Sequence, residues 1–276
     1  IKPTIMLFIP QIATQIYTVL DKTMIGVIVS NKAEVGYYEQ AQKMIKLLMT
    51  IATSLGTVMM PRIAATFASG DHKKVREYMN KSFSFILLLA FPLMFGIISV
   101  SSSFVPIFYG KGYDKVVSLL CVISPIIILI GLSNVTGTQY LLPTKKQNQY
   151  TLSVVVGAIV NFILNLILIK HFASIGASIA TVIAELVVTA TQFILIRKEI
   201  KFIDVAKLSY KYVIASLIMF ICSMIVGHFI KDNFLSIILQ VMVSCFVYFI
   251  FLYILNDKLI IEAVNKVGNK LRKEVK

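Results

Sequence analysis

The stretch TIMLFIPQIATQIYTVLDKTMIGVI, from Thr4 to Ile28, decides how the rest of the chain is interpreted. It is long and apolar, and about 25 residues at about 1.5 Å each would cross the hydrocarbon core of a bilayer as a helix. At about 100° per residue its polar side chains share an arc of roughly 120°; they are Thr4, Gln11, Thr14, Gln15, Thr18, Asp21 and Lys22. Because polar groups in hydrocarbon are costly unless they face a bundle interior or a water-filled cavity, the stretch predicts a spanning helix with one wet side.

The composition of the whole chain agrees with a membrane protein. Of its 276 residues, 58% are hydrophobic and only 14% are charged, and the mean hydropathy is +0.85. These values exclude a soluble globular domain. Polar loops separate apolar spans at about 4–29, 44–67, 82–106, 116–140, 150–170, 174–196, 212–231 and 235–255. The predicted fold class is therefore an all-α, polytopic transmembrane helix bundle.

The net charge of +14 reflects loop composition and does not indicate a nucleic-acid partner. Counted on alternate sides of the membrane, 19 of the 27 Lys and Arg residues fall on one side and 7 on the other, with Lys22 inside the first span. By the positive-inside rule the richer side is cytoplasmic, which puts both ends of the chain there. The chain opens directly into a span at Ile1, and we interpret it as a fragment that lacks an upstream part.

Polar stripes recur on three further spans. Lys43, Lys46 and several Thr and Ser residues share one face of 44–67, Asn161 and Asn165 share a face of 150–170, and Glu185 lies on the polar face of 174–196. Such stripes indicate either a wet lining or helix–helix contacts through small and hydroxyl side chains, and both interpretations stay open. The spans 212–231 and 235–255 show no stripe and are predicted to be peripheral.

Some of these polar residues suit particular chemistry. Glu185 lies about 11 residues into its span, roughly 16 Å deep, so it is a candidate proton carrier or else a structural hydrogen-bonding carboxyl. The amides of Gln11 and Gln15 suit sugar hydroxyls, and Lys22 and Lys46 suit an anion. The sequence has no phosphate-cradling Gly-rich loop, nucleophile elbow or zinc motif, so we predict a transporter without a cofactor and not an enzyme.

Four segments resemble one known family. They are LFIPQIATQIYTVLDKTMIG (7–26), EVGYYEQAQKMIK (34–46), LGTVMMPRIA (55–64) and GLSNVTGTQYLLPTKKQNQYTLS (131–153). Together they are similar to the Wzx-type polysaccharide flippases of the multidrug/oligosaccharidyl-lipid/polysaccharide exporter superfamily. The resemblance covers about residues 1–200 and implies the second six-helix lobe of a two-lobed, MATE-like transporter. Residues 201–276 would then be two additional helices with a basic tail, and the first lobe would be missing.

The resemblance also implies a function. Relatives move undecaprenyl-diphosphate-linked oligosaccharides across the bacterial cytoplasmic membrane for capsule, exopolysaccharide or O-antigen synthesis, by alternating access that is ion-coupled. The implied partners are that lipid-linked oligosaccharide, membrane lipids and other polysaccharide assembly proteins. The alternatives are a multidrug or cation antiporter of the same superfamily and, more remotely, a membrane polysaccharide polymerase.

Under this interpretation the candidate residues have three roles. Glu185 is the candidate for proton or ion coupling, and Arg62 lies at the cytoplasmic mouth. The substrate pathway is predicted to be lined by Gln11, Gln15, Thr18, Asp21, Lys22, Lys46, Asn161 and Asn165.

Overall fold

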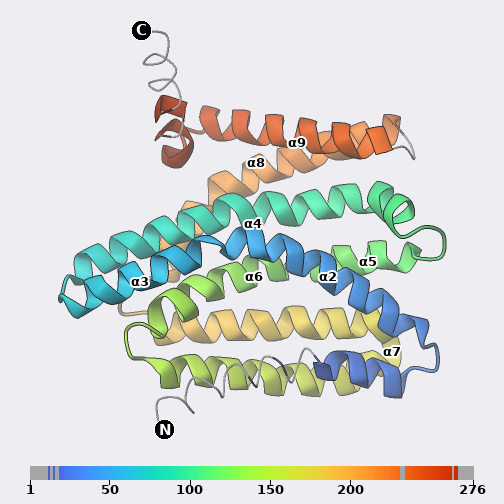
Figure 1. Cartoon of the computed structure of the whole chain (residues 1–276), viewed down its shortest axis with the longest axis horizontal. Helices are drawn as coiled ribbons and strands as arrows, with labels where there is room; N and C mark the ends of the chain where they lie inside the picture. The colour runs from blue at the N-terminus through green and yellow to red at the C-terminus, as the bar shows by residue number, and fades with distance from the viewer. Residues whose placement is uncertain (1–11, 13–14, 16–18, 231–233, 263, 267–276) are drawn as a thin grey trace.

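The computed structural model describes residues 12, 15, 19–230, 234–262 and 264–266, and every regular element in these ranges is a helix (Figure 1). By length and composition, five of the helices could cross a membrane, or six if a bent pair is counted as one span. The prediction of an all-α, multi-pass membrane bundle is therefore confirmed. The predicted division into a lobe ending near residue 200 and an additional pair stays a prediction.

The chain enters through a helix that is described over residues 19–28, followed by α2 (Ala33–Thr53) and α3 (Leu55–Ala68). The predicted span 44–67 begins too late, because residues 33–43 are helical and not a loop. Tyr38, Ala41 and Ile45 recur at helical spacing and are at most 1% exposed, so the charged residues between them occupy the opposite face of one amphipathic helix.

A bend of 42° separates α2 from α3 at Ser54. Four hydroxyl groups around it each donate to a backbone carbonyl of the preceding turn, at 2.6–2.9 Å; they belong to Thr50, Thr53, Ser54 and Thr57. Hydroxyls bonded back to their own helix in this way favour bending. Pro61 follows inside α3 and supplies no N–H of its own.

The next span is a single long helix, α4 (His72–Phe108), which begins ten residues before the predicted span at 82. Asp71 caps it, because its carboxylate accepts a hydrogen bond of 2.9 Å from the backbone N–H of Lys74. A broken span follows, made of α5 (Asp114–Ile123), α6 (Ile126–Ser133) and the π-helix η1 (Asn134–Leu141). Pro125 separates α5 from α6.

The element α7 (Gln147–Leu195) is a helical hairpin, too long at 49 residues for one span. It reverses at Ala173, whose φ of 50° and ψ of −129° are not helical, between the spans predicted at 150–170 and 174–196. Figure 1 shows its two halves running side by side at the lower edge. Gly157 packs against Val188 of the other half, and Gln192 Nε2 donates to Ser153 Oγ at 3.1 Å.

Two further helices, α8 (Phe202–Phe229) and α9 (Phe234–Ile254), pack against each other and against α4, at the upper edge of Figure 1. The hydroxyl of Tyr248 donates to the carbonyl of Leu88 at 2.7 Å, and Gln240 Nε2 donates to Ser103 Oγ at 3.1 Å. These polar side chains attach α9 to α4, while both α8 and α9 also carry many exposed large apolar residues.

Candidate functional site: a polar cavity

The described residues line an open cavity of about 570 Å³, bounded by the first helix, α2, α6, η1 and both halves of α7. This volume lies in the range of about 300–1,000 Å³ that small-molecule sites occupy in proteins. Apolar side chains such as Val19, Met49 and Ile130 alternate around the wall with polar ones. Neither α8 nor α9 contributes to its lining, in keeping with the predicted peripheral position of these helices.

One wall of the cavity is positively charged. Lys22 from the first helix and Lys43 from α2 both approach Oε1 of Glu39, with N···O distances of 3.4 and 3.3 Å. Lys46 lies one turn beyond Lys43 and has no carboxylate within ion-pair distance among the described residues. Three ammonium groups thus share one wall with a single carboxylate.

The rest of the lining supplies hydrogen-bonding groups. Glu185 and Gln192 come from the second half of α7, and Asn134 comes from the start of η1. The π-helix packs tightly against α7, because a Cβ on Gly137 would lie 2.7 Å from the ring of Tyr150. π-Helical turns are rare in proteins and are frequently found at functional sites.

A buried polar cluster lies directly behind the cavity and is centred on Asp21, which is fully buried. Its carboxylate accepts hydrogen bonds from Tyr38 Oη at 2.7 Å, from Thr181 Oγ1 at 3.0 Å and from Asn165 Nδ2. Asn165 Nδ2 also donates to Asn161 Oδ1 at 3.0 Å. The cluster therefore joins four helical segments through one carboxylate, and no ion pair within the described residues involves it.

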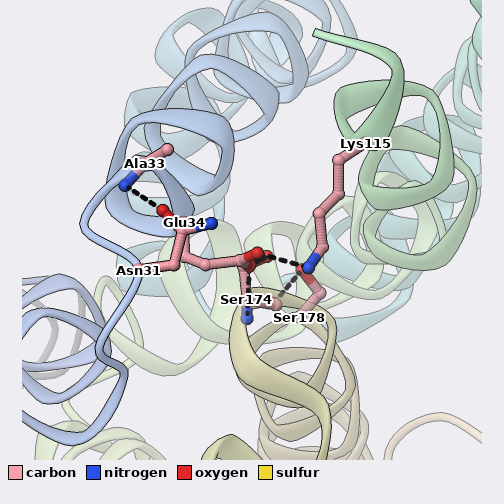
Figure 2. A network of polar contacts seen from close by, with 6 residues as sticks. All are labelled: Asn31, Ala33, Glu34, Lys115, Ser174 and Ser178. Atoms are coloured by element: carbon pink, nitrogen blue, oxygen red, sulfur yellow. Dashed lines mark hydrogen bonds and ion pairs between the residues drawn. The ribbon is translucent and has the colours of Figure 1, made fainter. Parts of the chain in front are cut away.

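A second buried carboxylate, Glu34, fastens one end of the bundle (Figure 2). Its Oε1 pairs with Lys115 Nζ, and its Oε2 accepts hydrogen bonds from the hydroxyl and, at 3.2 Å, from the backbone N–H of Ser174. Ser174 directly follows the reversal at Ala173, so this contact holds the start of α2, the start of α5 and the tip of the α7 hairpin together.

A third polar contact joins loops at the other end of the bundle. Lys146, which precedes α7, pairs with Glu199, which follows α7, and Arg76 of α4 donates to the carbonyl of Glu199. Lys146 Nζ also lies 5.1 Å from the ring centroid of Tyr140. Burial by itself would lower the pKa of Lys146, but the hydrogen bond to Glu199 and the contact with Tyr140 outweigh it, so the pKa is raised.

The structure separates the predicted pathway residues into groups. Gln15, Lys22, Lys46 and Glu185 line the cavity. Three others do not line it: they are Asp21, Asn161 and Asn165, which are buried in the cluster behind the wall. Arg62 is exposed on α3 and is not part of the lining. Gln11 and Thr18 lie outside the described residues.

Sequence reasoning missed Tyr38, Glu39 and Glu34. The two carboxylates lie in the segment 33–43, which the sequence predicts to be a loop outside the membrane. A signal was present in the sequence, since the 33–45 segment has a helical alternation of apolar and charged residues that continues the span after it.

Comparisons with known proteins agree with the resemblance. The model of a family described as "Polysaccharide biosynthesis protein" matches residues 4–118. The chain is 29% identical over 194 residues to the lipid II flippase MurJ of Bacillus subtilis (strain 168), covering 69% of this chain and 34% of that protein. It is 27% identical over 190 residues to a putative O-antigen transporter of Escherichia coli (strain K12), covering 69% of this chain and 45% of that protein.

Solved structures give the same fold. An inward closed conformation of the lipid II flippase MurJ superposes with a TM-score of 0.79 at 22% identity, over 92% of this chain and 53% of that one. A multidrug resistance MATE family transporter in an outward-facing conformation gives a TM-score of 0.62 at 17% identity, over 90% of this chain and 63% of that one. The resemblance to Wzx-type flippases is thereby confirmed, and the chain spans less than half the length of the two curated relatives described above.

Proposed function

We propose that this chain forms one lobe of a flippase that moves a lipid-linked oligosaccharide across the bacterial cytoplasmic membrane. The substrate would be an undecaprenyl-diphosphate-linked repeat unit for a capsule, exopolysaccharide or O-antigen. The other lobe would complete the passage, and the lobes would rock between inward- and outward-facing states.

The observation that carries this proposal is the mixed chemistry of the cavity. A diphosphate requires cations, which Lys22, Lys43 and Lys46 supply on one wall. Sugar hydroxyls bind amides and carboxylates, and the lining contains Gln15 and Asn134 beside Glu185. The isoprenoid tail needs no aqueous room, because it can stay in the bilayer while the headgroup crosses.

The same wall argues against a drug or cation antiporter of the superfamily. A site for an organic cation would be expected to hold more carboxylates than ammonium groups, whereas this lining has three lysines against Glu39 and Glu185. A polymerase is still less favoured, because the connection between α4 and α5 and the reversal at Ala173 are only a few residues long.

Coupling to an ion gradient would fall to Glu185, which lines the cavity, and to Asp21, which is buried directly behind it. Asp21 is buried, and its carboxylate accepts hydrogen bonds from the neutral side chains of Tyr38, Asn165 and Thr181, so it is a candidate to take up a proton or a cation. Thr181 belongs both to this cluster and to the cavity lining, which links the occupancy of Asp21 to the substrate space. We include Asp21 beside Glu185 as a coupling residue.

Orientation follows from charge. The loop end that carries Arg76, Lys146 and the basic segment around residues 197–211 would face the cytoplasm, and the Glu34–Lys115 end would face outward. Arg62, in the second half of α3, would then remain a candidate for the cytoplasmic mouth.

Depletion of the full-length protein in its own host tests the function. Lipid-linked oligosaccharide should accumulate on the inner leaflet, and the wild-type gene should reverse this. The double variant Lys22→Gln/Lys46→Gln and the single variant Gln15→Leu should reverse it less well at normal membrane levels, whereas Lys111→Gln, which removes an exposed loop charge, should act as wild type. An unchanged leaflet distribution on depletion would refute the proposal.

A further inference from the structure

Two carboxylates five residues apart on α2 are held in very different ways. Glu34 is 5% exposed, and both of its oxygens are engaged by Lys115 and Ser174. The side chain of Glu39 is 37% exposed, and two ammonium groups share its Oε1 at 3.3 and 3.4 Å. Good charge-assisted bonds of this kind are about 2.7–2.9 Å long. The ion pairs of Glu39 are longer than this and partly exposed, whereas Glu34 is buried and bonded through both of its oxygens.

The partners of Glu39 are also adaptable. The side chains of Lys22 and Lys43 are 35% and 60% exposed, and both lie on the cavity wall beside Lys46. Partly exposed pairs between long side chains contribute little and are easily exchanged for another partner. An anion entering the cavity would therefore compete with Glu39 for the same two ammonium groups.

We propose that Glu39 is a displaceable counter-ion that sets the affinity of the cavity for its anionic substrate. In the empty cavity it neutralises Lys22 and Lys43. A ligand with two or more adjacent negative charges displaces it and gathers the three lysines, and the return of Glu39 helps to release that ligand. This role rests on the proposed function, and it makes Glu39 a positioning residue that acts through the two lysines.

A displaceable counter-ion at Glu39 would make release of the substrate faster. A site with three uncompensated cations would bind a diphosphate so tightly that its release would be slow. Transport requires binding that is weak enough for the ligand to leave the site. Neutralising Glu39 should therefore tighten binding and slow turnover together, which lowers KM and the maximal transport rate at once. Loss of a merely structural contact would lower the amount of folded protein without tightening binding.

The test is titration of inorganic diphosphate into the purified full-length protein at fixed ionic strength. Glu39→Gln should bind about three- to tenfold more tightly than wild type, because two exposed ion pairs no longer compete, each equivalent to a factor of up to about five. Glu39→Asp should return the affinity towards the wild-type value. Glu77→Gln makes the same charge change at an exposed position of α4 and should stay within about twofold.

The outcomes separate this inference from the function on which it rests. If Lys46→Gln binds diphosphate more weakly than wild type but Glu39→Gln binds no more tightly than wild type, the counter-ion role is refuted and the proposed function stands. If neither wild type nor any variant binds diphosphate, the counter-ion role is refuted, and the depletion experiment alone decides the proposed function. If Glu77→Gln tightens binding as much as Glu39→Gln does, the effect is one of net charge and the counter-ion role is again refuted.

Discussion

The close packing of the α7 hairpin gives the most quantitative prediction. A Cβ at position 157 would lie 2.3 Å from Val188 Cγ2 and 3.3 Å from the carbonyl oxygen of Ala184. Because carbon atoms pack at about 3.5–4.0 Å, Gly157→Ala must push the two halves apart by more than about 1 Å. Overpacking costs about 1–3 kcal/mol, and the better helix propensity of Ala returns up to about 1 kcal/mol. We expect a net loss of about 1–2 kcal/mol in the free energy of unfolding.

The measurement is unfolding of the purified protein in mixed micelles by increasing SDS, followed by circular dichroism. Gly36→Ala is the matched control, because nothing lies within 4 Å of its Cβ position, and it should be neutral or slightly stabilising. Adding Val188→Ala to Gly157→Ala removes the clashing methyl group and should recover at least about 1 kcal/mol relative to additivity. Additive effects, or a Gly157→Ala protein as stable as wild type, would refute the packing argument.

Three further predictions concern charged groups. Glu34→Gln should lower the free energy of unfolding by about 1–3 kcal/mol, which is less than for a fully buried pair because the Lys115 side chain is 34% exposed. The same SDS titration measures this loss, and an unchanged midpoint would show that Glu34 does not hold α2, α5 and α7 together. Glu185→Gln should lower transport more than it lowers the membrane level, measured by complementation beside quantitative immunoblotting, and equal losses would indicate a structural carboxyl. Because the pKa of Lys146 is raised, its pairing with Glu199 stabilises the protein fully below the usual lysine pKa, and this stabilisation is lost as the pH rises through the raised value. The melting temperature of Lys146→Gln should therefore fall less than that of wild type above about pH 10. Parallel falls in melting temperature for the two proteins would refute this.

The sequence predicted the spans better than their boundaries. Long apolar runs identified the fold class, and the reversal at Ala173 falls in the short polar gap that separates 150–170 from 174–196. The segments 33–43 and 72–81 were predicted as loops because their charges lower the local hydropathy. The helices extend through them because one face is buried and the other tolerates charge, which average hydropathy cannot detect.

The candidate site was predictable as a set of polar positions but not as a geometry. Gln15 and Lys22, which share the polar arc of the first span, lie at the cavity, whereas Asp21 of the same arc is buried, where Tyr38 and Asn165 supply hydrogen bonds from other helices. Periodicity within one helix cannot tell a cavity from a buried contact, since both are polar faces directed away from lipid. Deciding between them requires the partners, which come from distant parts of the chain.

The bend between α2 and α3 has a consequence for how this lobe can move. In a lipid environment a helix cannot change its curvature freely, because each carbonyl that loses its amide partner has no water to replace it. Near Ser54 the hydroxyl groups already donate to carbonyls of the same helix, so those oxygens retain a partner over a range of angles. The angle between α2 and α3 can therefore change without leaving these oxygens unpaired, while Glu34 keeps the start of α2 in place and α3 stays packed on η1.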